Sequence, residues 1–461
     1  MAINLTGSNV LILGAGVTGI AVAKSLSVKG ASVEFADDQV SAVEGFSVLS
    51  TELADVTKYE FIVVSPGWKE SHPLIVKAKT AEIRIVNEID LAWSFRAELV
   101  PNQKWIALTG TNGKTTTVEM AAAMLRAAGT NAIACGNVGT TVIESVESPE
   151  KYDVLVLELS SFQLHWMREA SFVAAAILNI AQDHVDWHGT FAEYARVKGS
   201  ILDRASTGIF NAGDMEVVNQ ATHWQGRKVF FSLDTPAPGE LGIVEDLLVD
   251  RAFVSDPQEA AMLAEVIDVK PTVPHNVANA LAAAGLVRAL GVSTEAIQSA
   301  LQNFSLGRHR IEEVAKINGI SWVNDSKATN PHATAASLNS SLSSIWIAGG
   351  LAKGAQMQEL IARCKSRIKA AILIGADREL IAHELRTQAP EIEIIFVDAP
   401  ASYQKGGSDN SLMEEVVKAA LERAVSGDTV LLAPACASMD QFVSYSDRGD
   451  RFAAAVKKVV Q

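Results

Sequence analysis

The chain has 461 residues, of which 48% are hydrophobic and 20% charged, and its formal net charge is −14. At roughly 150 residues per domain, this length predicts about three globular domains. The acidic balance argues against a nucleic-acid binder, because such proteins carry basic patches. No uncharged stretch reaches the about 18 residues that a membrane span needs, so we expect no membrane-spanning segment.

The cysteines and the N-terminal residues indicate the cellular compartment of the protein. The three cysteines, Cys135, Cys364 and Cys436, are far apart and have no C-x-x-C spacing, which predicts a reducing environment and no metal knuckle. The apolar stretch 10–23 is interrupted by three glycines and follows no basic segment, so it does not have the pattern of a signal peptide. We therefore expect a cytoplasmic protein.

The first predicted unit begins with NVLILGAGVTGIAVAKSLSVKGASVEFADD, residues 9–38, which has the pattern strand, glycine turn, helix, strand. Gly14, Gly16 and Gly19 fit G-x-G-x-x-G, and Asp37 and Asp38 follow near the distance of a ribose-binding acid. The motif places backbone N–H groups and a helix N-terminus against a diphosphate. It is compatible with an NAD or FAD site, a site for another nucleotide diphosphate, or a ligand-free tight turn. The unit is expected to end at the polar stretch 98–104.

A second glycine turn follows in WIALTGTNGKTTT, residues 105–117. The usual phosphate loop is G-x-x-x-x-G-K-[ST], but its first position here is Leu108 and the glycine stands at Gly110. An apolar strand precedes the turn and a helix rich in Ala, Met and Leu follows it. In this setting, loop N–H groups face an anion, Lys114 supplies a charge, and the Thr115 hydroxyl can bind Mg²⁺. The alternative is a plain glycine turn with a surface lysine.

Polar residues follow two further apolar strands. Glu158 ends the run VLVLE, and His184 lies in the polar stretch 179–188, with Lys198 on the next predicted helix. The carboxyl ends of parallel strands share one edge of a sheet, so these side chains are expected near Lys114. A carboxylate and an imidazole beside a triphosphate suggest Mg²⁺ ligation. A satisfied strand-end acid and an ordinary polar loop are the structural alternatives, and the H-E-x-x-H pattern of zinc hydrolases is absent.

The stretch GTNGKTT, residues 110–116, resembles the ATP loop of the Mur ligase family, which also includes folylpolyglutamate synthetases. Members of that family use ATP to join an amino acid to a carboxylate through an acyl phosphate. LELSSFQL (157–164) and APACASMDQF (433–442) resemble members that add D-glutamate to UDP-N-acetylmuramoyl-L-alanine. The D-N-P-R stretch that is usual in members adding a diamino acid is absent.

The resemblance covers essentially the whole chain and implies an α/β fold with three domains. These would be a Rossmann-like UDP-substrate domain over residues 1–98, a P-loop-type central ATPase with a mostly parallel sheet over 99–306, and a Rossmann-like amino-acid domain over 307–461. It also implies ATP as a substrate and Mg²⁺ as a cofactor. The expected process is cytoplasmic peptidoglycan precursor synthesis, and hence cell wall biogenesis, cell shape and cell division. We expect a monomer.

The resemblance assigns site residues by matching positions. The expected ATP-binding residues are Gly110, Thr111, Asn112, Gly113, Lys114, Thr115, Thr116, Asn276, Arg310 and Asp325. The expected metal ligands are Thr115, Glu158, His184 and Lys198, the last as a carbamate, and Lys114, His184 and Lys198 are the expected catalytic residues. The UDP-substrate positions are Gly14, Val17, Thr18, Asp37, Asp38 and Asn137. The D-glutamate positions are Lys327, Thr329, Lys353, Ser438 and Tyr445.

Three rival functions remain at this stage. A sister Mur ligase or a folylpolyglutamate synthetase is the rival within the family, and the N-terminal G-x-G unit argues against the folate enzymes, which lack it. An NAD-dependent redox protein built on Gly14 to Gly19 is the rival from another class, and tight NADH binding without ATP turnover would favour it. A non-enzymatic scaffold would not need Lys114, Glu158 and Lys198 on one edge.

Overall fold

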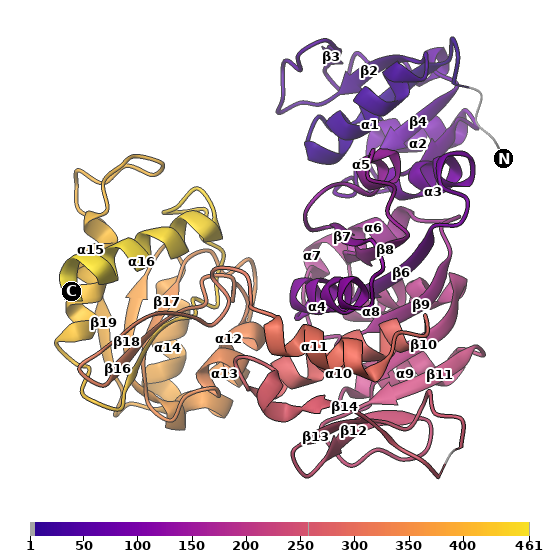
Figure 1. The fold of residues 1–461 in the computed structure, drawn as a ribbon. Coiled ribbons are helices and arrows are strands. Elements are labelled where there is room, and N and C mark those ends of the chain that lie inside the picture. Colours follow the sequence, from indigo (N-terminus) through magenta and orange to yellow (C-terminus); the bar gives the residue numbers. More distant parts are fainter. Residues whose placement is uncertain (1–4, 257, 461) are drawn as a thin grey trace. The chain divides into compact units, whose positions relative to one another are not determined.

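The computed structural model describes residues 5–256 and 258–460. The chain forms two compact units, Met1–Phe304 and Ser305–Gln461. The first unit holds two β-sheets and the second holds one, as the ribbon in Figure 1 shows. All three sheets are mostly parallel, which confirms the predicted α/β class. None of the helices in the described ranges is both long enough and apolar enough to cross a bilayer.

The first sheet is parallel, with the strand order β3-β2-β1-β4-β5. Its strands are β1 (Asn9–Leu13), β2 (Ser32–Ala36), β3 (Ser47–Leu49), β4 (Phe61–Val64) and β5 (Arg84–Val86). Its helices are α1 (Val17–Val28), α2 (Pro73–Thr80) and α3 (Glu88–Leu99). Every residue of β4 is buried, as expected of a strand covered on both faces. The strand order reverses between β1 and β4, and such a reversal opens a crevice for ligands at the carboxyl ends of the strands.

The second sheet has nine strands in the order β14-β13-β12-β11-β10-β9-β6-β8-β7. The strands from β7 to β12 in this order are parallel, and β12, β13 and β14 form an antiparallel edge. The strands are β6 (Lys104–Thr109), β7 (Ala132–Gly136), β8 (Val154–Glu158), β9 (Phe172–Ile177), β10 (Ala205–Asn211), β11 (Arg227–Phe231), β12 (Glu240–Val244), β13 (Leu247–Asp250) and β14 (Ala261–Glu265).

Helices cover both faces of this sheet. One face carries α4 (Lys114–Ala127), α10 (Pro274–Arg288) and α11 (Thr294–Asn303), which share a buried core with it. The remaining helices of this part are α5 (Val142–Glu147), α6 (Ser161–Trp166), α7 (Val185–His188), α8 (Phe191–Gly199), followed directly by the 3₁₀ helix η2 (Ser200–Arg204), and α9 (Met215–His223).

A single buried core joins the first two sheets. It runs from the α1 side of the first sheet through Phe95 of α3 to Val142 and Val146 of α5 and on to Trp105 of β6. Two buried carboxylates reinforce it: Glu88 Oε1 accepts from the Ile143 N–H over 2.7 Å, and Asp90 accepts from backbone N–H groups of residues 168–170. The first two sheets therefore form one compact unit, and a domain boundary near residue 98 stays a prediction.

The third sheet, in the second unit, has the order β15-β16-β20-β17-β18-β19, with β15 as its antiparallel edge. The strands are β15 (Glu312–Ile317), β16 (Ile320–Asn324), β17 (Ser344–Gly349), β18 (Ile368–Ile374), β19 (Glu393–Phe396) and β20 (Thr429–Leu432). One face packs on α12 (Pro331–Leu338), α13 (Gln358–Cys364) and α14 (Arg378–Gln388). The other packs on α15 (Ser411–Leu421) and α16 (Tyr445–Val460).

Candidate active site

The predicted phosphate loop connects β6 to α4. Gly113 caps α4 with φ of 83°, and a Cβ there would collide with Asn279 Oδ1, so only glycine fits. The Asn179 side chain braces the loop, accepting from the Asn112 N–H over 2.8 Å and donating to the Asn112 carbonyl over 3.0 Å. The N-terminus of α4 thus follows a rigid turn at the carboxyl end of β6, which is the setting in which helix termini bind phosphate.

Lys114 is the first residue of α4 and bends back over this loop. Its Nζ donates to the carbonyls of Gly110 and Thr111 over 2.8 and 2.9 Å. Thr115 and Thr116 follow in the first helical turn, and both are buried. The predicted ATP residues 110–116 therefore form one continuous segment of loop and helix start.

Lys198 reaches the same loop from α8. Its side chain is nearly inaccessible, at 2% exposure, and its Nζ donates to the Gly110 carbonyl over 2.9 Å. Burial, reinforced by the nearby Lys114 charge, holds the pKa of the Lys198 amine well below its ordinary value. A deprotonated amine is the form that can react with CO₂, so the predicted carbamate suits this environment.

Glu158 ends β8, the neighbour of β6, and it is also 2% exposed. Its Oε1 accepts from Asn137 Nδ2 over 2.8 Å, whereas its Oε2 is buried and has no hydrogen-bond partner within residues 5–256 and 258–460. A buried carboxylate oxygen without a donor is costly unless a cation completes its surroundings. Glu158 therefore fits a hard cation such as Mg²⁺. Asn137, predicted to contact the UDP-substrate, orients Glu158 in this structure.

His184 is more exposed than Glu158 and Lys198, the two buried ligands predicted beside it. It precedes α7 with φ of 50°, its side chain is 46% exposed, and its Nε2 lies 3.6 Å from Asp183 Oδ2. Partial burial lowers the pKa of the imidazole. The Asp183 charge opposes this, and the charges of Lys198 and Lys114 add to it, which places these groups in one electrostatic neighbourhood. In the described ranges, no three His, Cys, Asp or Glu side chains form a cluster able to hold a metal. A Mg²⁺ site here would therefore need the Thr115 hydroxyl, a modified Lys198 or phosphate oxygens as well.

The glycine turn of the first sheet has the predicted tight geometry. Gly14 has φ of 97°, and a Cβ on Gly19 would collide with the Gly14 carbonyl. Asp37 Oδ2 accepts from the Ala15 N–H over 2.8 Å, and although burial opposes it, this and two further N–H donors lower the pKa of Asp37.

The neighbouring predicted positions differ in their surroundings. The Asp38 carboxylate accepts hydrogen bonds from the backbone N–H and the hydroxyl of Thr51, over 2.8 and 2.6 Å. Val17 is 78% exposed, and Thr18 follows it in the first turn of α1. Asp37 thus braces the glycine turn, whereas Asp38 holds the segment that follows β3.

The predicted D-glutamate residues of the second unit follow three adjacent strands, four of them in loops and Tyr445 at the first position of α16. Lys327 and Thr329 follow β16, Ser438 and Tyr445 follow β20, and Lys353 follows β17. Lys327 Nζ lies 5.3 Å from the centre of the Tyr445 ring. Lys353 has φ of 49° and Ser438 is buried. The structure thus brings these five residues to one edge of the third sheet.

Asp325 is the first residue after β16 and is buried there. It accepts from the Ser337 hydroxyl and, over 3.3 Å, from the Ile311 N–H. Burial raises its pKa to about 6, although the nearby Arg310 and Lys327 oppose the rise. Arg310, predicted beside the nucleotide, and Asp325 therefore belong to one charged neighbourhood.

Arg448 was missed by the sequence analysis. Its guanidinium is fully buried, and it donates to Ser326 and to the Cys436 carbonyl, and more weakly to the Gly349 carbonyl. Desolvation lowers its pKa to about 10. It holds together the segments after β16, β17 and β20 that carry Lys327, Thr329, Lys353 and Ser438. An arginine on a terminal helix gives no sequence signal for such a role.

Asn276 and Asn279 lie one turn apart on α10. Asn276, the predicted adenine-side residue, is buried and donates to the carbonyls of Lys270 and Pro271 over 3.3 and 3.2 Å. Asn279 lies against Gly113 of the phosphate loop and was not predicted. The i, i+3 spacing of the two asparagines is the signal that could have identified Asn279.

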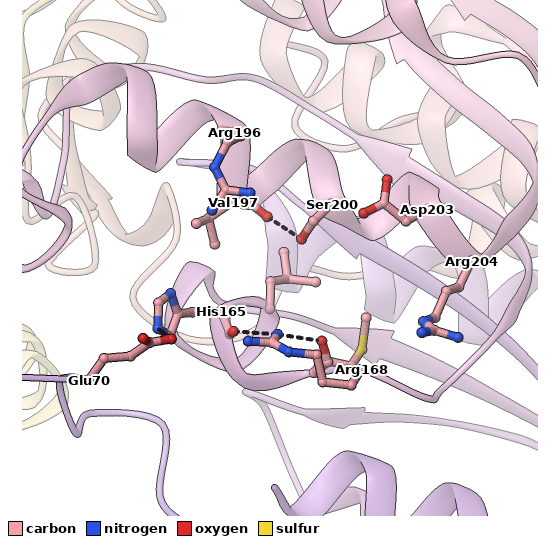
Figure 2. A pocket seen from close by; sticks show the side chains of 10 residues that line it. Glu70, His165, Arg168, Arg196, Val197, Ser200, Asp203 and Arg204 are labelled. Carbon is pink, nitrogen blue, oxygen red and sulfur yellow. Dashed lines mark hydrogen bonds and ion pairs between the residues drawn. The ribbon is translucent and has the colours of Figure 1, made fainter. Parts of the chain in front are cut away.

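A cavity of about 430 Å³ lies along α6, α8 and η2 and contains none of the predicted site residues (Figure 2). Charges of both signs line it, including Glu70, Asp203 and three arginines. Arg196 is paired with Glu193 and Arg168 donates to backbone carbonyls, and the guanidinium groups in Figure 2 do not converge on one point. The cavity therefore lacks the convergent polar groups of a specific ligand site.

Comparison with known proteins finds relatives over the whole chain. The Mur ligase middle domain matches residues 108–287, and the Mur ligase glutamate ligase domain matches residues 309–436. The UDP-N-acetylmuramoylalanine–D-glutamate ligase of Streptomyces coelicolor is 45% identical over the full length of both chains. The chain belongs to the Mur ligase family. The enzyme of the same name from Thermobifida fusca is 46% identical, over 98% of this chain and 99% of its own.

Solved structures of Mur ligases share the fold at low sequence identity. A MurF ligase from Thermotoga maritima, in complex with ADP, is 16% identical and matches with a TM-score of 0.58 over 100% of this chain and 99% of its own. A UDP-N-acetylmuramate–alanine ligase from the same organism is 17% identical, with a TM-score of 0.57 over 98% and 99%. The three-part Mur ligase architecture therefore extends over the whole chain.

Proposed function

We propose that this Mur ligase adds D-glutamate to UDP-N-acetylmuramoyl-L-alanine at the expense of ATP. Full-length relatives at 40–46% identity that bear this name support the choice within the family. The observation that carries the proposal is the grouping of the half-buried Lys114 with the buried Lys198 and Glu158 around the loop that begins at Gly110. A loop flanked by two lysines, beside a carboxylate with one oxygen that has no hydrogen-bond donor, is suited to holding a nucleoside triphosphate and its Mg²⁺.

Each group on this edge has a distinct role in the proposal. The ammonium of Lys114 neutralises phosphate charge, and the N-terminus of α4 orients the phosphate oxygens. Mg²⁺, when bound by Thr115, Glu158, His184 and carbamylated Lys198, supplies further neutralisation of the phosphate charge. Asn137 holds Oε1 of the Glu158 carboxylate and leaves Oε2 available to a cation.

The proposed reaction has two steps. The γ-phosphoryl group of ATP passes to the L-alanyl carboxylate, which leaves ADP and an acyl phosphate. The amine of D-glutamate then attacks the acyl carbon, and inorganic phosphate and a proton leave as the amide forms. Phosphoryl transfer depends mainly on positioning and charge neutralisation, and the acyl phosphate must be kept from water.

The third sheet provides the proposed amino-acid site. Lys327 and Lys353 offer positive charges to the two carboxylates of glutamate, and Ser438 offers a hydroxyl from the loop between β20 and α16. Arg448 fixes the loops that present these groups. The glycine turn at Gly14 is the proposed site of the uridine diphosphate, with Asp37 bracing the backbone of the turn and Asp38 holding the neighbouring segment at Thr51.

The proposed setting is the cytoplasm and the proposed state is a monomer. All three cysteines are free and buried, which suits a reducing compartment. Size-exclusion chromatography with light scattering measures the mass in solution, and a mass near 49 kDa is expected for the monomer.

Phosphate release with UDP-N-acetylmuramoyl-L-alanine across a panel of L- and D-amino acids tests the function. We expect release with D-glutamate and none with L-glutamate, diamino acids or a folate acceptor. Release that depends on a diamino acid would assign the chain to a sister ligase, and release with a folate acceptor to the folate branch. Tight NADH binding without ATP turnover would reject the ligase altogether.

A further inference from the structure

The short helix α7 joins the two sheets of the first unit. The indole Nε1–H of Trp187 donates to the Gly67 carbonyl over 3.0 Å. One residue earlier, the Asp186 carbonyl accepts from Lys69 Nζ over 2.9 Å. Gly67 and Lys69 belong to the turn that follows β4, at the carboxyl end of the first sheet. The helix that follows His184 is therefore bonded to the first sheet at two points.

The same turn lies against the glycine turn that is proposed to bind the uridine diphosphate. Ser65 Oγ donates to the Gly14 carbonyl over 3.3 Å. A Cβ placed on Gly14 would stand 2.9 Å from the indole nitrogen of Trp68, so this ring closes over the glycine turn. A ligand bound at Gly14 would therefore lie next to residues 65–69 and affect their position.

On its other side, Trp187 packs toward the proposed phosphate edge. Its ring centre lies 4.9 Å from that of Phe162, and the Phe162 ring lies 4.7 Å from that of His184. Trp187 also lies 4.6 Å from His188, which contacts Tyr194 at 5.4 Å. The Tyr194 hydroxyl in turn hydrogen-bonds the phosphate loop over 3.0 Å. Two contact routes thus run from Trp187 to groups proposed to handle ATP.

The imidazole of His184 depends on these neighbours for its position. Its backbone is in the left-handed region, which a histidine keeps only when surrounding structure enforces it. The ring is nearly half exposed, and Phe162 packs on one side of it. A residue that fixes both Phe162 and the start of α7 therefore fixes His184.

We propose that Trp187 is a positioning residue that ties His184 to the first-sheet turn, so that binding of the UDP-substrate strengthens binding of the nucleotide. The inference rests on the proposed function, because it takes the glycine turn as the UDP-substrate site and His184 as part of the ATP site. It assigns a role to a side chain that contacts neither substrate.

The test measures the coupling between the two ligands. The Kd of a non-hydrolysable ATP analogue is determined with and without saturating UDP-N-acetylmuramoyl-L-alanine, and kcat and each KM are determined in parallel. Trp187→Phe keeps the ring beside Phe162 but removes the indole donor, and Lys69→Met removes the second bond. Trp224→Phe is the matched control, because its half-buried indole also donates to one backbone carbonyl, that of Leu202, over 3.0 Å.

We expect the UDP-substrate to tighten nucleotide binding in the wild type. Loss of one hydrogen bond should reduce this coupling factor about three- to tenfold in Trp187→Phe and in Lys69→Met. By linkage, the effect of the nucleotide on the Kd of the UDP-substrate falls by the same factor. Trp224→Phe should leave the coupling unchanged, and the KM for D-glutamate should stay the same in all three variants.

Two results would overturn the inference. One is a wild-type coupling factor of one, and the other is equal coupling in the wild type, Trp187→Phe and Trp224→Phe, even if the Trp187 variant is less heat-stable. A wild type that binds both ligands but releases no phosphate with D-glutamate would refute the proposed function instead. The binding and turnover measurements thus separate the two failures.

Discussion

Glu88 gives a quantitative prediction for the core that joins the first two sheets. The residue is fully buried, and desolvation raises its pKa to about 7, although the Ile143 N–H favours the carboxylate. The unfolded chain titrates near 4.5. Because the folded state holds its proton to higher pH, the favourable contribution is complete below about pH 4.5 and is lost as the pH rises through about 7.

The size of this effect follows from the difference between the two pKa values. A difference of roughly 2.5 units corresponds to about 3 kcal/mol, lost at about 1.4 kcal/mol per pH unit between pH 4.5 and 7. Glu88→Gln keeps an oxygen that can accept from the Ile143 N–H but does not titrate. The variant should therefore unfold at higher denaturant concentration than the wild type at pH 8 and lose this advantage toward pH 5.

The assay is urea unfolding followed by tryptophan fluorescence at pH 5, 6, 7 and 8. Tryptophans near this core, Trp93 and Trp105, pack together with ring centres 4.9 Å apart and report on it. Exposed Glu150 provides the control, because Glu150→Gln should leave the pH dependence of the wild type intact. Parallel pH profiles for the wild type and Glu88→Gln would refute the reasoning.

Three further predictions concern the site. Lys198→Ala should lose nearly all turnover and regain part of it with added acetate, measured as phosphate release, and full activity without acetate would reject the carbamate. Gly113→Ala forces a left-handed conformation on a side chain that collides with Asn279, so ATP KM should rise or kcat fall at least tenfold, whereas Gly129→Ala, also at positive φ but in open space, should keep activity. Arg448→Lys cannot reproduce the forked contacts to Ser326 and Cys436, so the KM for D-glutamate should rise while nucleotide affinity is kept, and an unchanged KM would contradict this.

The sequence predicted features that depend on local pattern. The glycine turns at Gly14 and Gly113, the strands before them and the helices after them are present as expected, because short-range backbone geometry dictates them. The placement of Lys114 and Glu158 at one edge also followed, since parallel neighbouring strands bring their carboxyl ends together.

Long-range contacts could not be predicted in the same way. Asn137 holds Glu158 from 21 residues away, and Asn279 meets Gly113 from a helix more than 160 residues later in the chain. Trp187 contacts a turn 120 residues earlier, and nothing in its local sequence indicates the partner. The local sequence also could not show that the first 304 residues form one compact unit. The core that joins the two sheets consists of apolar residues, and nothing in the sequence distinguishes them from the apolar residues of other cores.

That shared core has a consequence for how segments of such chains can be exchanged. If the chain were cut near residue 98, Phe95 and the Glu88 carboxylate would lose the residues of α5 that they pack against or accept a hydrogen bond from. A chimaera that takes the stretch before this cut from a relative must therefore also bring the matching face of α5, or it will aggregate. The segment proposed to bind the sugar nucleotide is thus not a detachable module, and we expect its sequence to change only together with that of the second sheet, which shares its core.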